Sequence, residues 1–273
     1  MSCIEVVGVW GVDTDPQFTA KKEQLKQLLQ GKSVSIFGDS ICTFNGVAND
    51  VSANSTIGIN KQYYPAGNVQ SADETFWMQL VQEYGMKLLV NNSWSGSCVI
   101  PVKPDGAGYG SRATQLHADA GVNSGKNPDI IICNMGTNDI LSDKPVGTMD
   151  AMTFAWAQQY VDGQMTVAPS SFAAGYAVML EKVTRQYPDA DIFLINMLVS
   201  STIGIEKSEK YNKVVNAAAE HYGCQIVDLT HCYMSGANYA AYSNDDLHPN
   251  KSGMDLWTNL VAETMMEHYL KEN

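Results

Sequence analysis

Five short apolar runs divide the chain, and each is followed by a polar turn and a stretch with helical periodicity. Each run is rich in branched side chains and apolar on both faces, which is typical of strands that helices cover on both sides. The runs are residues 34–37, 88–90, 130–133, 192–195 and 226–229. This β–α alternation predicts a single α/β domain built on a doubly wound, mostly parallel sheet of about five strands.

Between and after these runs, apolar residues recur three or four positions apart, which is the spacing of a helix with one buried face. Four helices are expected, over residues 76–84, 172–187, 211–222 and 257–269. Pro188 and Gly223 stand where the second and third should stop, because proline ends a helix and glycine favours its C-terminal turn.

Three segments lie outside the alternation. Residues 1–32 precede the first run and are expected to pack on the domain as an N-terminal extension. Residues 44–75 form an insertion rich in Asn, Ser and Gly, and a loop of that length is uncommon unless it has a function. Residues 140–170 form a second insertion, which we expect to be partly helical. The whole chain, 1–273, is therefore predicted to be one domain.

Composition and charge exclude several classes of protein. Lys plus Arg number 17 and Asp plus Glu number 29, which gives a net charge of −12, and Arg112 and Arg185 are the only arginines. A nucleic-acid binder needs clustered basic residues, so that class is disfavoured. Hydrophobic residues make up 45% of the chain, which argues against disorder. No uncharged apolar run approaches the ~18–20 residues that a membrane span needs.

The signals for a cellular compartment are weak. The N-terminus has no basic segment before its apolar residues, so it does not resemble an uncleaved secretory signal. Six cysteines are scattered without C-x-x-C spacing, which favours a reduced, cytoplasmic setting, with secretion after removal of a signal as the alternative. Cys133 lies inside an apolar run and is expected to be buried. Cys42 and Cys98 are expected to be small packing side chains.

A polar motif follows four of the five runs. The motifs are G-D-S at 38–40, N-S-W-S-G at 92–96, G-T-N-D at 136–139 and, further beyond its strand, D-D-L-H-P at 245–249. Ligands of an open α/β sheet bind beyond the carboxyl ends of the strands. The first three motifs should therefore lie at one edge of the sheet, and the fourth can reach that edge on its loop.

These motifs contain the residue types of a serine-nucleophile site. The hydroxyl of Ser40 is a weak nucleophile without a base, and the imidazole of His248 can take its proton and return it to a leaving group. Asp245, three residues earlier, can bond the other ring nitrogen and fix the tautomer. The backbone N–H groups of Ser40 and Gly96 and the side-chain amide of Asn138 are candidate donors to an oxyanion.

Each motif also has a plain structural explanation. G-D-S and G-T-N-D are good turn sequences, and an isolated D-x-x-H can be a surface turn or half a metal site. The combination is more specific than its parts, because four independent turns would have to coincide. The remaining histidines have no partner motif and are expected to be structural; they are His117, His221, His231 and His268.

The four blocks resemble those of the SGNH, or GDSL-type, hydrolase superfamily. Its Ser, Gly, Asn and His blocks match Ser40, Gly96, Asn138 and His248 in order, with Ile41 where the family usually has Leu. The resemblance implies a three-layer α/β/α sandwich with five parallel strands, a flavodoxin-like arrangement. It also implies a metal-independent esterase mechanism in which Ser40, His248 and Asp245 act as a triad and Gly96 and Asn138 belong to the oxyanion hole.

The sequence thus predicts a serine esterase for carboxylic esters, with short-acyl or O-acetyl esters, including those of carbohydrates, as the favoured substrates. Tyr63, Tyr64 and Trp94 suit sugar rings, although they could equally pack a loop onto the sheet. No cofactor or metal is expected, because no P-loop, G-x-G-x-x-G or H-E-x-x-H motif occurs. A lysophospholipase or thioesterase of the same superfamily, and a non-catalytic binding protein on this fold, stay open as alternatives.

Overall fold

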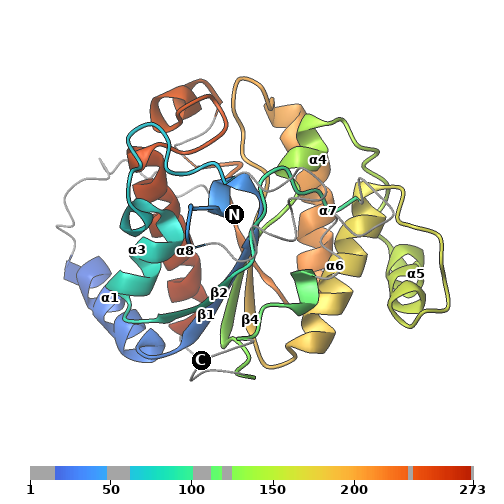
Figure 1. Ribbon diagram of the computed structural model, residues 1–273, viewed down its shortest axis with the longest axis horizontal. Helices are drawn as coiled ribbons and strands as arrows, with labels where there is room; N and C mark the ends of the chain where they lie inside the picture. Colours follow the sequence, from blue (N-terminus) through green and yellow to red (C-terminus); the bar gives the residue numbers. More distant parts are fainter. Residues whose placement is uncertain (1–15, 48–61, 101–111, 119–124, 233–235, 272–273) are drawn as a thin grey trace.

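A single parallel sheet organises the described part of the chain. The computed structural model describes residues 16–47, 62–100, 112–118, 125–232 and 236–271 (Figure 1). Much of the 44–75 insertion and of the 1–32 extension lies outside the described residues. The strand order is β2-β1-β3-β4-β5, and every neighbouring pair is parallel. The strands are β1 (Ser33–Gly38), β2 (Lys87–Asn91), β3 (Ile130–Asn134), β4 (Asp191–Ile195) and β5 (Gln225–Val227).

All five strands lie on the apolar runs that predicted them. In the interior of the sheet, β1 and β3 are buried at every position, because helices cover both of their faces. The end of β5 differs from the prediction, since the strand stops at Val227 although the apolar run continues to Leu229. There the Asn196 Oδ1 atom accepts the hydrogen bond of the Leu229 N–H at 2.7 Å, so a side chain replaces the neighbouring strand.

The helices form one layer on each face of the sheet, which confirms the predicted α/β/α sandwich (Figure 1). One layer contains α1 (Pro16–Leu29), α3 (Phe76–Glu83) and α8 (Lys251–Tyr269), and the other contains α6 (Phe172–Gln186) and α7 (Ile205–Tyr222). The helices α7 and α8 begin earlier than the sequence predicted. Their first turns are rich in polar residues, so the apolar pattern used for the prediction does not extend over them. None of the helices in the described ranges is both long and apolar enough to cross a membrane.

The 140–170 insertion is partly helical, as predicted. It contains α5 (Ala151–Val161), whose first turn is capped by Asp150 Oδ1 accepting from the Thr153 N–H at 2.9 Å. This helix lies on the outer side of α6, at the right edge of Figure 1. Ala157 is its one buried residue, so α5 covers the fold without joining the central core.

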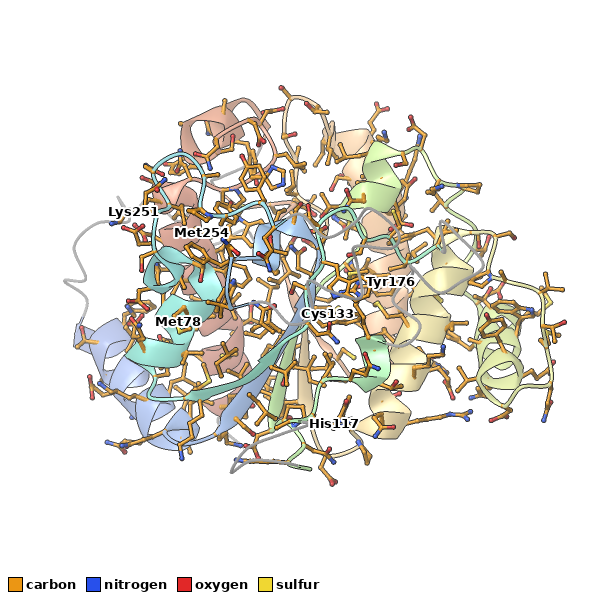
Figure 2. All side chains as sticks on the ribbon, in the orientation of Figure 1. Met78, His117, Cys133, Tyr176, Lys251 and Met254 are labelled. Atoms are coloured by element: carbon orange, nitrogen blue, oxygen red, sulfur yellow. The ribbon has the colours of Figure 1, made fainter. Side chains whose placement is uncertain are left out.

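Large side chains fill the space between the layers. Trp77 and Trp257 are fully buried on the α3 and α8 side, and Cys133 of β3 is buried near the middle of the molecule, as predicted (Figure 2). A buried aromatic side chain removes roughly 150–250 Å² from water, which makes such residues the main apolar contribution to a core. The loops after the strands therefore rest on a tightly packed base.

Candidate active site

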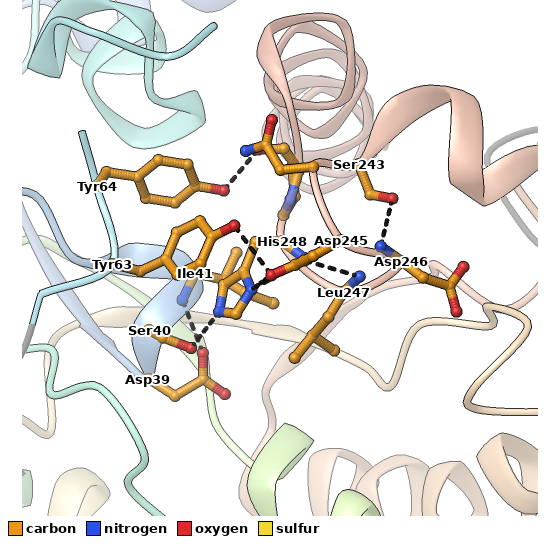
Figure 3. A network of polar contacts seen from close by, with 12 residues as sticks. Asp39, Ser40, Ile41, Tyr63, Tyr64, Ser243, Asp245, Asp246, Leu247 and His248 are labelled. Carbon is orange, nitrogen blue, oxygen red and sulfur yellow. Dashed lines mark hydrogen bonds and ion pairs between the residues drawn. The ribbon is translucent and has the colours of Figure 1, made fainter. Parts of the chain in front are cut away.

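The turn after β1 places the Ser40 hydroxyl at the edge of the sheet. Asp39 Oδ1 accepts from the Ile41 N–H at 3.0 Å and caps a short 3₁₀ turn, Ser40–Cys42. Gly38 has no room for a side chain, since a Cβ there would lie 2.6 Å from Cys42 Sγ. The sharp turn leaves Ser40 Oγ 2.8 Å from His248 Nε2 (Figure 3). Both side chains are largely buried, so bulk water has little access to this bond.

The loop before α8 holds the imidazole of His248 through Asp245. His248 Nδ1 lies 2.9 Å from Asp245 Oδ2 and 3.1 Å from Asp245 Oδ1. The backbone N–H groups of Leu247 and His248 donate to Asp245 Oδ1 at 3.2 and 2.8 Å. The carboxylate therefore fixes its own loop as well as the ring. The three side chains predicted to act together form one hydrogen-bonded series, from Asp245 through His248 to Ser40.

The electrostatics of the series favour a neutral imidazole next to a charged carboxylate. Burial lowers the pKa of His248, and the hydrogen bond and charge of Asp245 oppose this effect without cancelling it. Partial burial tends to raise the pKa of Asp245, but the hydrogen bonds from the His248 backbone, the His248 ring and Tyr63 lower it overall. At neutral pH, His248 can thus accept a proton, and Asp245 can stabilise the resulting cation.

Asn138 is bonded to the turn that contains Gly96. Asn138 is the second residue of α4 (Thr137–Leu141), directly after β3, and its Nδ2 donates to Ser97 O at 3.0 Å. This bond holds the amide beside the residue that follows Gly96, which is exposed and has a φ of 78°. The turn into α4 needs Gly136, because its φ is 124° and a Cβ would lie 2.9 Å from Met197 Cε.

A buried arginine under the site had no signal in the sequence. The guanidinium of Arg112 donates to Asn92 O at 2.6 Å and to Gly38 O at 3.3 Å, and it lies over the rings of Phe37 and Trp94. Burial lowers the pKa of Arg112 to about 9, although the charge of Asp39 opposes the shift. Arg112 thus ties the carboxyl ends of β1 and β2 together. Its contacts also explain why Trp94 is buried.

Two further carboxylates fix the loops around the site. Asp139, the last residue of G-T-N-D, accepts from the N–H groups of Val99 and Ile100 at 2.8 and 3.0 Å. Burial raises its pKa to about 7. Asp246 has a φ of 64°, and its Oδ2 accepts from the hydroxyl of Ser201 at 2.6 Å. Both residues belong to motifs that the sequence singled out, but the groups that bind them could not be identified from spacing.

The aromatic residues proposed to contact sugar differ in exposure. Tyr64 is 1% exposed and Trp94 8% exposed, so both pack loops onto the sheet. Tyr63 is half-buried, with its ring stacked on His248. Cys42 and Cys98 are free and buried, which agrees with packing roles, and burial raises the pKa of both thiols.

The remaining histidines contact residues outside the Ser40 series. His231 Nδ1 lies 2.9 Å from Asp228 Oδ2, His268 Nε2 lies 3.2 Å from Asp191 Oδ1, and His221 stacks on Phe154. His117 lies at the lower edge of the molecule, 3.0 Å from the hydroxyl of Tyr187 (Figure 2). Within the described residues, no three His, Cys, Asp or Glu side chains are grouped as a metal site would require.

The chain is similar to known proteins over most of its length. The family model described as GDSL-like Lipase/Acylhydrolase matches residues 32–265. A search of curated protein sequences found no significant match.

Solved structures with the same fold cover most of the chain. A proposed GDSL-like lipase from Bacteroides uniformis is 25% identical, with a TM-score of 0.62 over 87% of this chain and 97% of that one. A proposed GDSL-like lipase from Bacteroides ovatus is 22% identical, with a TM-score of 0.62 over 87% and 99%. A proposed lipase from Chitinophaga pinensis is 15% identical, with a TM-score of 0.54 over 88% and 100%.

Proposed function

Because the chain belongs to the GDSL-like lipase/acylhydrolase family and is thus a serine hydrolase acting on esters, we propose that Ser40, His248 and Asp245 carry out its reaction. The observation that carries the proposal is the 2.8 Å contact between Ser40 Oγ and His248 Nε2, with Asp245 on the other ring nitrogen. A hydroxyl, a neutral imidazole and an ionised carboxylate in this order are what nucleophilic catalysis by serine requires.

The reaction has two steps. His248 Nε2 takes the proton of Ser40 as Oγ attacks the acyl carbonyl, and a tetrahedral intermediate forms. The imidazolium, next to Asp245, then gives its proton to the leaving alcohol, and an acyl-serine is left. Water repeats the sequence: His248 removes its proton, its oxygen attacks the acyl carbon, and the carboxylic acid leaves as Ser40 recovers its proton.

The oxyanion is assigned to three donors around the serine turn. They are the backbone N–H groups of Ser40 and Gly96 and the Nδ2 of Asn138. The bond from Asn138 to Ser97 O supports this assignment, because it fixes the amide before substrate arrives, and preorganised donors stabilise a developing charge most effectively. Each such donor contributes on the order of 10²–10³ in rate.

The proposed substrates are esters with a short acyl group, O-acetylated carbohydrate among them. The large hydrophobic side chains that are exposed in the described residues are Leu28, Met152, Val167 and Ile205. None of them belongs to the described parts of the loops that carry Ser40, Gly96, Asn138 or His248, so these parts present no fully exposed large apolar side chain to a long acyl chain. Comparing kcat/KM for acetyl, octanoyl, lysophospholipid and thioester substrates tests this choice. A preference for octanoyl or lysophospholipid substrates would contradict it.

A fluorophosphonate probe tests the proposed chemistry. Such probes form a covalent bond with an activated serine, so we expect stoichiometric labelling of the folded protein, with the label on Ser40 by peptide mass spectrometry. Denatured protein serves as the control and should not react. A folded protein that does not react would favour a binding protein on this fold and contradict the proposal.

The pH dependence of kcat/KM follows from the lowered pKa of His248. The general base must be neutral, so activity should fall as the pH drops through the pKa of His248. Because burial lowers this pKa, the acid limb of kcat/KM should lie below about 6.5, the ordinary value for histidine. A pH profile with a non-ionising ester measures it. An acid limb above about 6.5 would contradict this prediction, because the protein would then stabilise the charged imidazole more than its burial destabilises it.

A further inference from the structure

Tyr63 contacts both members of the histidine–aspartate pair. Its ring is nearly parallel to the imidazole of His248, with 7° between the planes and 3.5 Å between the centroids. Its hydroxyl donates to Asp245 Oδ2 at 2.9 Å, and the same oxygen lies 2.9 Å from His248 Nδ1 (Figure 3). A residue from the 44–75 insertion therefore touches a pair that lies more than half the chain away.

Hydrogen bonds and ring packing hold Tyr63 between the Ser40 turn and the loop that carries His248. The Tyr63 N–H donates to Thr43 Oγ1 at 2.9 Å, and Thr43 Oγ1 donates to Ser40 O at 2.7 Å. The ring of Tyr64 lies edge-on to that of Tyr63, with centroids 4.8 Å apart, and the Tyr64 hydroxyl donates to Pro249 O. Tyr63 thus connects the turn that holds the nucleophile with the loop that holds the base.

The segment that follows Tyr63 is bonded to the start of α8, just beyond the His248 loop. Asn68 Oδ1 accepts from the Lys251 N–H at 2.7 Å, and Glu74 Oε1 pairs with Lys251 Nζ at 2.8 Å. Gly67 packs so closely on Asn244 that a Cβ would lie 1.9 Å from its side-chain oxygen. Because the segment is held on both sides, Tyr63 presents a fixed ring to the imidazole.

We propose that Tyr63 is the positioning residue of His248, an inference that rests on the proposed hydrolase mechanism. The side chain of Asp245 is 44% exposed, so water competes for its hydrogen bonds and weakens its hold on the ring. The Tyr63 hydroxyl holds this carboxylate, and the stacked Tyr63 ring keeps the imidazole in the plane that aims Nε2 at Ser40. An aromatic face next to the imidazolium also stabilises the charge that forms during attack.

Two variants separate the hydroxyl from the ring. Tyr63→Phe removes only the hydrogen bond, so kcat should fall by about 3–10-fold. Tyr63→Ala also removes the stacked surface, and misplacement of the base should lower kcat by about 30–100-fold. KM should stay within about twofold in both, because the proposed role is in the chemical step. Should Tyr63→Ala fail to fold, Tyr63→Leu replaces it, since it keeps apolar volume but not the planar face.

A pH profile of kcat/KM distinguishes a positioning role of Tyr63 from a purely structural role, which a measurement of stability cannot do. Ser40, Asp245, Tyr63 and Tyr64 are the groups that face the imidazole of His248. Removing the Tyr63 ring admits water to one face, so the pKa of His248 should rise towards its ordinary value. The acid limb of kcat/KM should then move to higher pH in Tyr63→Ala and stay close to its original position in Tyr63→Phe.

Tyr269→Phe is the matched control. It removes a bond of the same type, from a tyrosine hydroxyl to Asp191 Oδ2 at 2.6 Å, at the amino end of β4, and should leave kcat unchanged. Wild-type kcat and an unmoved acid limb in Tyr63→Ala would overturn the inference, as would a rise in KM alone. Failure of the unaltered protein to label with fluorophosphonate would instead overturn the proposed mechanism, and the role of Tyr63 with it.

Discussion

Replacing Ser40 with alanine is expected to lower ester hydrolysis by about 10⁴–10⁶-fold, while the protein folds as before. The reaction depends on a nucleophile that His248 can deprotonate, and Ser40 Oγ lies 2.8 Å from its Nε2. Among the residues that the structure describes, the Ser40 hydroxyl bonds only to His248, whereas the caps that hold its turn come from Asp39 and from the backbone. Steady-state hydrolysis of a p-nitrophenyl ester, together with thermal unfolding, measures both parts of this prediction.

Ser171→Ala separates lost chemistry from lost stability. Ser171 Oγ accepts from the Ala174 N–H at 3.2 Å and caps α6, so its removal should cost about 1 kcal/mol of unfolding free energy. Activity should be retained in this control. If Ser40→Ala kept a tenth or more of the wild-type activity, with the fluorophosphonate label absent, another group would have to supply the nucleophile, and the assignment of Ser40 would be wrong.

The sheet could be predicted from sequence because each strand is short, apolar on both faces and followed by a helical pattern. This was sufficient for β1 and β3, which are buried at every position. It was not sufficient for the end of β5, because a run of apolar residues does not show that Asn196 will bond the backbone of Leu229. The residues of a strand predict where it lies, whereas its end depends on a hydrogen-bond partner elsewhere in the chain, here the side chain of Asn196 just beyond β4.

The candidate site also contains residues that the sequence could predict and residues that it could not. Ser40, His248 and Asp245 could be proposed from local motifs, because strands of a parallel sheet bring their carboxyl ends to one edge. The contacts of Tyr63 and Arg112 could not be predicted, because the tertiary structure determines which residues they meet. The bond from Tyr63 to Asp245 spans 182 positions, and Arg112 reaches Gly38 across 74. No spacing rule in a single sequence connects such pairs, and neither residue lies in one of the four motifs.

The arrangement around Asp245 makes Asp245→Asn a sharper test of the mechanism than removal of the side chain. Asp245 Oδ1 accepts from two backbone N–H groups, those of Leu247 and His248. An amide nitrogen cannot accept these bonds, so the asparagine oxygen must take the position of Oδ1. The NH₂ group is then placed at the position of Oδ2, next to His248 Nδ1, which lies 2.9 Å from that atom in the unaltered protein.

An NH₂ group in that position selects the wrong tautomer of His248. It donates to Nδ1, so the ring proton moves to Nε2, which then faces Ser40 Oγ as a donor and cannot accept the serine proton. We expect kcat to fall by about 10³–10⁴-fold with little change in KM. Asp245→Ala leaves Nδ1 open to water and should retain more activity, although it also loses the bonds that hold the loop. Greater activity in the asparagine variant than in the alanine variant would contradict tautomer control, and would mean that the bonds of Asp245 to its own loop are its larger contribution.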